Sequence, residues 1–104
     1  MDFDVFKNRV RMSKEDMHRE FFQKNRDRIK VKKETVAVKN LMKISEATLA
    51  LSNEKGFSAM SMRDLSTEAG LSMGALYSYF SNKDELLDMI QQQSLRVTAR
   101  VLVD

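Results

Sequence analysis

Residues 61–80 read SMRDLSTEAGLSMGALYSYF and contain the start and stop signals of two short helices. Ser61 is followed three residues later by Asp64, which is the spacing of a capping box at the start of a helix. Gly70 suits the left-handed position that ends a helix, because glycine has no Cβ to clash there. Together these signals predict a short helix over residues 61–69.

A second helix is expected directly after the first. Ser72 follows Gly70 closely and has a side chain well suited to capping a helix start. Leu76 and Phe80 lie on one side of the helix that this cap opens, over residues 73–80. Two short helices joined by a turn of about three to four residues are typical of a helix-turn-helix, whose second helix enters the DNA major groove.

Longer helices are expected on both sides of this pair. Residues 36–55 carry one face with helical spacing and end at Gly56; the face consists of Leu41, Ile44, Thr48 and Leu51. On the other side, Asn82 and Glu85 have the capping-box spacing and open a helix over residues 82–104. The inner face of that helix is expected to consist of Leu86, Ile90, Val97 and Val101.

The N-terminal third is expected to contain one further helix. Ser13 and Asp16 have the capping-box spacing, so this helix would begin at Ser13 and run to about Lys33, with residues 1–12 loosely held. A thin apolar stripe along it consists of Met17, Phe21, Phe22 and Ile29. The β-branched residues near 35–38 lower the helix propensity and mark a soft boundary.

The composition agrees with an all-α protein of one domain. The chain has 104 residues, no Pro and few alternating apolar runs, and its three Gly all lie between residues 56 and 74. We expect a three-helix, helix-turn-helix DNA-binding bundle over residues 36–90, with a basic, partly helical extension over residues 1–35. Residues 91–104 would continue the start of a fourth helix.

The positive charge is concentrated in the N-terminal third. Residues 1–35 hold 11 Lys and Arg against 7 Asp and Glu, whereas residues 36–104 hold 7 against 8. The excess is densest where Asp27 is surrounded by Lys24, Arg26, Arg28, Lys30, Lys32 and Lys33. A basic arm beside a folded domain can neutralise DNA phosphates and release counterions. A solvated, highly charged helix face is the alternative interpretation.

Catalytic and metal chemistry find little support in the chain. It has no Cys and a single His, so zinc clusters of the Cys type and thiol nucleophiles are excluded. His18 is expected to form an exposed pair with Glu20 rather than part of a metal site. No paired carboxylates, nucleophile–base arrangement or phosphate loop indicates an enzyme, and no cofactor is expected. No apolar run reaches the ~18 residues that a membrane span needs.

Five sequence signals follow one another in a set order. They are Gly56-Phe57, Ser61-Met62-Arg63-Asp64-Leu65, Ala69-Gly70-Leu71-Ser72-Met73-Gly74-Ala75, Leu76-Tyr77-Ser78-Tyr79-Phe80 and Lys83-Asp84-Glu85-Leu86-Leu87. In this order and spacing, over about residues 40–90, they resemble the DNA-binding region of TetR-type transcriptional repressors. The resemblance implies a sequence-specific DNA-binding regulator.

The resemblance also implies which residues contact DNA. Residues 73–80 would form the recognition helix, and the expected contact set is Arg63, Ser72, Met73, Gly74, Ala75, Tyr77, Ser78, Tyr79 and Lys83. The tyrosines would reach phosphates or base edges, Lys83 would hold a phosphate, and Arg63 would read a base or a phosphate. Taken by themselves, the tyrosines also suit packing, Met73 suits gap filling, and Arg63 and Lys83 suit solvated charges.

The partners follow from the same resemblance. Such a repressor binds double-stranded DNA at a near-palindromic operator as a homodimer, in the bacterial cytoplasm and associated with the nucleoid. Its small-molecule effector binds a C-terminal domain that we expect to be missing here, so the chain would be a fragment. The alternative is a protein-interaction module that keeps the helix-turn-helix scaffold but has lost DNA binding.

Three features depart from the family pattern. Ser52 stands where Phe is usual and Ser45 where an aliphatic residue is common, and both are expected to thin the core around the helix over 36–55. The basic leader is also longer than the usual short arm.

Overall fold

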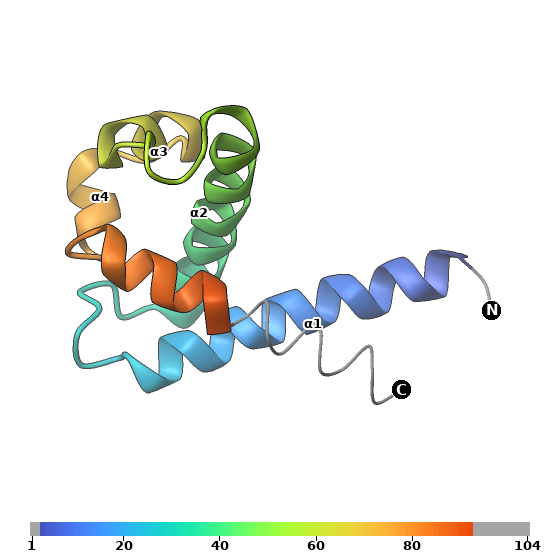
Figure 1. Cartoon of the computed structure of the whole chain (residues 1–104). Coiled ribbons are helices and arrows are strands. Elements are labelled where there is room, and N and C mark those ends of the chain that lie inside the picture. Colours follow the sequence, from blue (N-terminus) through green and yellow to red (C-terminus); the bar gives the residue numbers. More distant parts are fainter. Residues whose placement is uncertain (1–2, 93–104) are drawn as a thin grey trace.

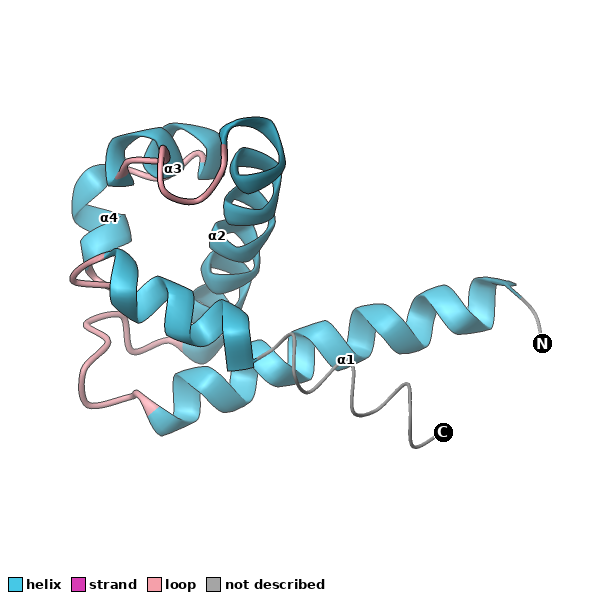
Figure 2. Ribbon diagram, viewed as in Figure 1, coloured by secondary structure: helices cyan, strands magenta, loops and turns pink. Residues whose placement is uncertain are grey.

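The computed structural model describes residues 3–92, with side chains from residue 14 onward, and every regular element in that range is a helix (Figures 1 and 2). The all-α fold is therefore confirmed. The helices are α1 (Phe3–Lys24), α2 (Glu34–Lys55), α3 (Met62–Ala69), α4 (Met73–Tyr77) and a further helical segment over residues 83–92.

The start and stop of α3 agree with the sequence prediction. The hydroxyl of Ser61 accepts the backbone N–H of Asp64 at 3.0 Å, and the Asp64 carboxylate accepts the backbone N–H of Ser61 at 3.0 Å. The second bond lowers the pKa of Asp64, because it stabilises the ionised carboxylate. At the other end, Gly70 has φ +70° and ψ +32°, which is the left-handed conformation expected there.

Helix α4 begins as predicted but ends earlier. The Ser72 hydroxyl accepts the backbone N–H of Ala75 at 3.1 Å, which confirms the cap. The helix stops at Tyr77 rather than at residue 80. The chain tightens there: the N–H of Ser78 is shared between the carbonyls of Gly74 and Ala75, and the N–H of Tyr79 bonds three residues back rather than four.

Helix α2 matches the predicted face and begins two residues earlier than residue 36. Val38 is buried at the start of this helix, so packing overrides the low helix propensity of its β-branched side chain. The predicted inner face is buried throughout, namely Leu41, Ile44, Thr48 and Leu51. Gly56 ends the helix with φ +84°, the positive φ that favours glycine, although its ψ of 149° is not that of a left-handed helix.

Helix α1 differs from the prediction at both ends. It begins at Phe3, so residues 3–12 are helical and Ser13 lies inside the helix rather than capping it. It ends at Lys24, well before residue 33, and the chain turns over residues 25–28. The side-chain amide of Asn25 donates to the carbonyl of Phe21 at 2.8 Å, in addition to the backbone N–H of Asn25, which bonds the same carbonyl at 3.1 Å.

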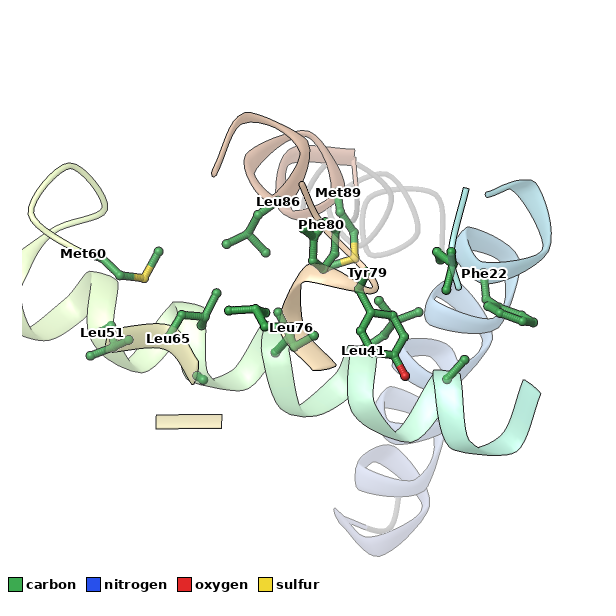
Figure 3. Close-up of a cluster of buried hydrophobic side chains, with 14 residues drawn as sticks. Phe22, Leu41, Leu51, Met60, Leu65, Leu76, Tyr79, Phe80, Leu86 and Met89 are labelled. Atoms are coloured by element: carbon green, nitrogen blue, oxygen red, sulfur yellow. The ribbon is translucent and has the colours of Figure 1, made fainter. Parts of the chain in front are cut away.

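One apolar core holds all of these elements together (Figure 3). Its buried members are Phe22, Ile29, Ala37, Leu41, Ile44, Ala47, Leu51, Met60, Leu65, Leu76, Tyr79, Phe80, Leu86 and Met89. Phe22 and Ile29 have no exposed surface, although both belong to the segment that was expected to form a basic extension. The last part of that segment is therefore packed against the bundle, while the N-terminal half of α1 extends away from it (Figure 1).

The only histidine also lies in the interior. His18 is 3% exposed, and its Nε2 is 2.7 Å from the hydroxyl of Ser45 on α2. Its Nδ1 bonds to the backbone carbonyl of Lys14. The prediction of an exposed pair with Glu20 is therefore wrong. Ser45, expected to thin the core, instead has a buried polar partner supplied by α1.

The segment over residues 83–92 begins with the predicted cap. Asn82 accepts the backbone N–H of Glu85 at 3.0 Å through its side-chain oxygen. Leu86 is buried and Ile90 is half-buried, as expected of an inner face, and the prediction missed Met89, which is fully buried. The expected positions Val97 and Val101 lie outside the described residues.

Candidate nucleic-acid interface

Helices α3 and α4 are held against α2 by buried side chains. Leu65 of α3 and Leu76 of α4 have no exposed surface and belong to the shared core (Figure 3). The opposite side of α4 is open: Tyr77 is 45% exposed, and a Cβ placed on Gly74 would meet nothing within 4 Å. The helix-turn-helix therefore presents one face of its second helix to the outside.

The expected contact residues differ in the exposure of their side chains. The exposed members are Arg63, Ser72, Gly74 and Tyr77. The half-buried members are Met73, Ala75, Ser78 and Lys83. Tyr79 is the fully buried member. Most of the set lies in α4 or at its ends, while Arg63 lies in the first turn of α3 and Lys83 at the start of the segment over 83–92.

Tyr79 is a correction to the expected set. Its side chain has no exposed surface, and its phenolic oxygen accepts a hydrogen bond of 3.0 Å from the side-chain amide of Asn40 (Figure 3). Burial raises the pKa of Tyr79. Helix α4 ends at Tyr77, and the tighter turn that follows places Tyr79 in the core while Tyr77 stays 45% exposed. Tyr79 is a packing residue in this structure.

Arg63 has the freest cationic side chain of the expected set. It is exposed on the first turn of α3, and its guanidinium has no hydrogen-bond or ion-pair partner within the part of the chain whose side chains are described. The neighbouring Asp64 is already engaged by Ser61 and by Lys55, whose Nζ is 3.4 Å from the carboxylate. The planar fork of Arg63 is therefore available for two parallel hydrogen bonds to a ligand.

Lys83 is bound within the protein. Its Nζ donates to the backbone carbonyl of Phe57 at 2.7 Å and lies 3.4 Å from that of Ser58. It also lies 4.7 Å from the centroid of the Phe57 ring, which is a cation–π distance. Lys83 thus fastens the loop after α2 to the segment over 83–92, a structural role that sequence reasoning did not find.

Two hydroxyls of the expected set act on α4 itself. Ser72 caps its start, and the Ser78 hydroxyl donates to the carbonyl of Gly74 at 3.0 Å near its end. Both hydroxyls therefore already have partners within the protein. The Ser72 cap was recognisable from the sequence, whereas the bond from Ser78 depends on where α4 ends.

A basic loop lies beside the end of α4, and sequence reasoning could not place it there. The backbone N–H of Lys30 donates to the carbonyl of Ser78 at 3.2 Å. Arg28 donates to the carbonyl of Tyr79 at 2.6 Å and pairs with Glu85 at 2.7 Å. These contacts bring residues 25–33 next to α4, and both lie at the same edge of the molecule (Figure 1).

Among residues 3–92, no helix is both long and apolar enough to cross a bilayer. Among the described side chains, those of residues 14–92, no cluster of three or more His, Cys, Asp and Glu has the arrangement of a metal site.

A known protein family matches the part of the chain that contains this face. Residues 44–90 match the family model of the bacterial regulatory proteins of the tetR family. The chain is similar to the HTH-type transcriptional regulator PksA of Bacillus subtilis (strain 168), with 49% identity over 49 residues, which is 47% of this chain and 24% of that protein. It is also similar to the HTH-type transcriptional regulator SAB2452 of Staphylococcus aureus (strain bovine RF122 / ET3-1), with 34% identity over 59 residues, or 57% and 32% of the two chains.

The matched part is short relative to both regulators. The chain spans about a third or less of the length of the curated relatives it matches. No solved structure matches the chain significantly.

Proposed function

We propose that the chain acts as a sequence-specific transcriptional repressor, because residues 44–90 match the family model of the bacterial regulatory proteins of the tetR family. In this function α4 enters the major groove of an operator. Repression follows when the bound protein blocks access of the transcription machinery to the same DNA.

One observation carries the proposal. The left-handed turn at Gly70 joins α3 to α4, and α4 turns its apolar Leu76 into the core while Gly74 and Tyr77 remain exposed. A helix held in this way can lie in the groove without unfolding any part of the bundle. Because Gly74 lacks a side chain, the backbone of α4 can approach the DNA closely.

Five exposed or half-buried residues of the expected contact set divide into two roles. Arg63 can bind the O6 and N7 atoms of a guanine through two hydrogen bonds. Met73 and Ala75 are half-buried and apolar, which suits contact with thymine methyl groups. Tyr77 supplies a hydroxyl donor on a rigid ring, and one free N–H of Lys83 suits a phosphate, so these two position the protein rather than read bases.

The partners complete the proposed mechanism. Two copies of the chain bind a near-palindromic operator, since a dimer with two-fold symmetry presents two copies of α4 to two half-sites. A dimerisation domain that binds a small-molecule effector accompanies this DNA-binding domain in the full regulator. Because the operator lies on the chromosome, the protein acts in the bacterial cytoplasm at the nucleoid.

Selection from random DNA tests the proposal directly. The chain is incubated with duplexes of random sequence, bound duplexes are amplified over several rounds, and their sequences are compared. We expect one half-site to be enriched, and the same chain fused after Asp104 to a dimeric coiled coil should enrich an inverted repeat of it. No binding at low salt, or binding without any enrichment, would contradict the proposal and favour a protein-interaction module.

A further inference from the structure

The loop that connects α1 to α2 is fastened to the helix-turn-helix. Its backbone meets the end of α4 through the bond between Lys30 and Ser78, and Arg28 bridges to Tyr79 and Glu85. Ile29 buries its side chain completely in the core. The loop is therefore held in one place beside α4.

Three of the six basic residues between 24 and 33 are engaged inside the protein. Lys24 pairs with Glu20 at 3.1 Å. Arg28 is pinned by the carbonyl and carboxylate described above. Lys32 donates to the backbone carbonyls of Arg26 at 2.7 Å and of Ile29 at 2.9 Å, so its ammonium closes the loop on itself. The cationic groups of these three side chains therefore already have partners within the protein, and those of Arg28 and Lys32 hold the loop in shape.

The other three basic side chains remain available. Arg26, Lys30 and Lys33 are exposed and have no carboxylate partner within the described side chains. Arg26 lies 5.4 Å from the centroid of the Phe22 ring, a contact that leaves its N–H groups free to donate. Asp27 is the acidic residue of the loop, so the exposed charge remains positive overall.

We propose that Arg26, Lys30 and Lys33 form a second DNA-contacting surface, which binds backbone phosphates beside the base pairs covered by α4. This inference rests on the proposed function, because it requires α4 to bring the loop to the DNA. The loop lies outside residues 44–90, so it is not part of the matched helix-turn-helix region.

The physical case depends on charge and rigidity. A lysine ammonium is a point charge that any phosphate satisfies, so the contact adds affinity without adding sequence preference. Each neutralised phosphate also releases counterions, which makes the contact visible in the salt dependence of binding. Because Arg28 and Lys32 already hold the loop in shape, little conformational entropy is lost when the DNA arrives.

The test is a double substitution, Lys30→Gln with Lys33→Gln, in the whole chain. DNA affinity is measured over a range of salt concentrations, on an enriched duplex and on a random duplex. The slope of log affinity against log salt should become shallower by about 0.9 for each lost phosphate contact, or about 1.8 in total. Affinity for the two duplexes should fall by the same factor.

Two control proteins define the result. Lys14→Gln removes one charge from an exposed residue of α1 that lies outside the loop, and should leave the slope unchanged. Lys30→Arg with Lys33→Arg keeps both charges and should keep the original slope. Arg26 stays unsubstituted, because its contact with Phe22 also contributes to packing.

The outcomes separate this inference from the proposed function. If the unmodified chain binds DNA and the double Gln variant keeps the original slope, the second surface is refuted while the function stands. A loss restricted to the enriched duplex would mean that the loop reads bases, which also refutes the phosphate contact. If the unmodified chain binds no DNA at all, both proposals fail together.

Discussion

Arg63 on α3 and Tyr77 on α4 are exposed, whereas Tyr79, only two residues from Tyr77, is enclosed by the core. At the scale of single residues, the direction of each side chain therefore decides its role. A residue type suited to DNA contact can act only where the backbone points it outward. Two sets of substitutions test this division.

We expect Arg63→Ala to reduce affinity for the enriched duplex and to relax the preference at one base position. The expected loss is about 1–3 kcal/mol, the range for removing a two-bond contact to guanine. Competition binding with every single-base variant of the half-site measures both effects. Equal weakening on enriched and random DNA would instead identify Arg63 as a phosphate contact.

The two tyrosines should respond in opposite ways to loss of the hydroxyl. Tyr79→Phe removes the acceptor of Asn40 and should lower the free energy of unfolding by about 0.5–1.5 kcal/mol, without weakening DNA binding in the folded protein. Tyr77→Phe should weaken DNA binding and leave stability nearly unchanged, since its side chain is 45% exposed. Urea unfolding and DNA titration of both variants measure the pair. A DNA defect in folded Tyr79→Phe would contradict its assignment to packing.

At the scale of elements, two glycines in the same short region have different reasons to be glycine. Gly70 has φ +70°, where any side chain is strained, whereas Gly74 lies inside α4 with open space where a Cβ would be. The first is therefore required by the backbone. No contact within the protein requires glycine at position 74, so the absence of a side chain there matters only for a ligand that approaches α4 from outside.

Substitution by Ala should separate these two reasons. Gly70→Ala should destabilise the domain by about 1–2 kcal/mol, the cost of a left-handed residue with a Cβ. Gly74→Ala should stabilise it by roughly 0.5–1 kcal/mol, because Ala favours helices, yet weaken DNA binding by adding a methyl group to the face of α4. Thermal unfolding and DNA titration report the two effects. Unchanged DNA affinity in Gly74→Ala would show that this face does not approach the groove closely.

The packing of α1 on α2 includes the buried pair of His18 and Ser45. A carbonyl oxygen only accepts, so Nδ1 of His18 carries the proton that bonds Lys14, and in the neutral ring Nε2 accepts from the Ser45 hydroxyl. Burial lowers the pKa of His18 below 6.5. The negative charge of Glu46 raises this pKa by a smaller amount, and the positive charge of Lys14 lowers it slightly further. The folded protein thus favours the uncharged ring.

This shift predicts a pH dependence of stability. At a pH between the pKa of His18 in the folded protein and its unfolded value of 6.5, the unfolded chain binds more protons than the folded one. The stability that comes from the uncharged His18 is therefore fully present above pH 6.5 and is lost as the pH falls. We expect the free energy of unfolding to drop between pH 7.5 and 5.5, and to drop less in His18→Gln. Urea titrations at both values measure it. The carboxylates are the same in both proteins, so an equal drop would contradict the role of His18.

At the scale of the whole molecule, the basic segment before α2 is both a charged surface and part of the core. Phe22 and Ile29 are fully buried, and α1 packs along α2. Removing the segment to test its charge would therefore remove core residues as well.

We expect a chain lacking residues 1–33 to lose its cooperative thermal transition. Loss of a buried residue as large as Phe22 typically costs about 3–5 kcal/mol, a large part of a small domain's stability of about 5–15 kcal/mol. A chain that begins at Lys14 keeps His18, Phe22 and Ile29, and should keep the transition. Calorimetry or circular dichroism on heating compares the two. A cooperative thermal transition in the chain that lacks residues 1–33 would show that residues 36–92 form a sufficient core alone.

The sequence by itself determined the helix-turn-helix, because its start and stop signals act over short distances. Ser61 and Asp64 bond each other within one turn, Gly70 needs only its own backbone angles, and Ser72 caps the next three residues. The inner faces of α2 and of residues 83–92 also followed from helical spacing, since one side of each helix must be buried. These elements could be predicted with no knowledge of their partners.

The contacts between distant segments could be seen only once the packing of the helices was known. His18 meets Ser45 across 27 residues, and Arg28 meets Glu85 across 57. Such pairs depend on how helices pack, which no local pattern encodes, so an exposed His18 and a first helix running on to Lys33 were reasonable but wrong predictions. The same packing turned Tyr79 inward, placed the basic loop beside α4, and left Arg26, Lys30 and Lys33 as its available charges.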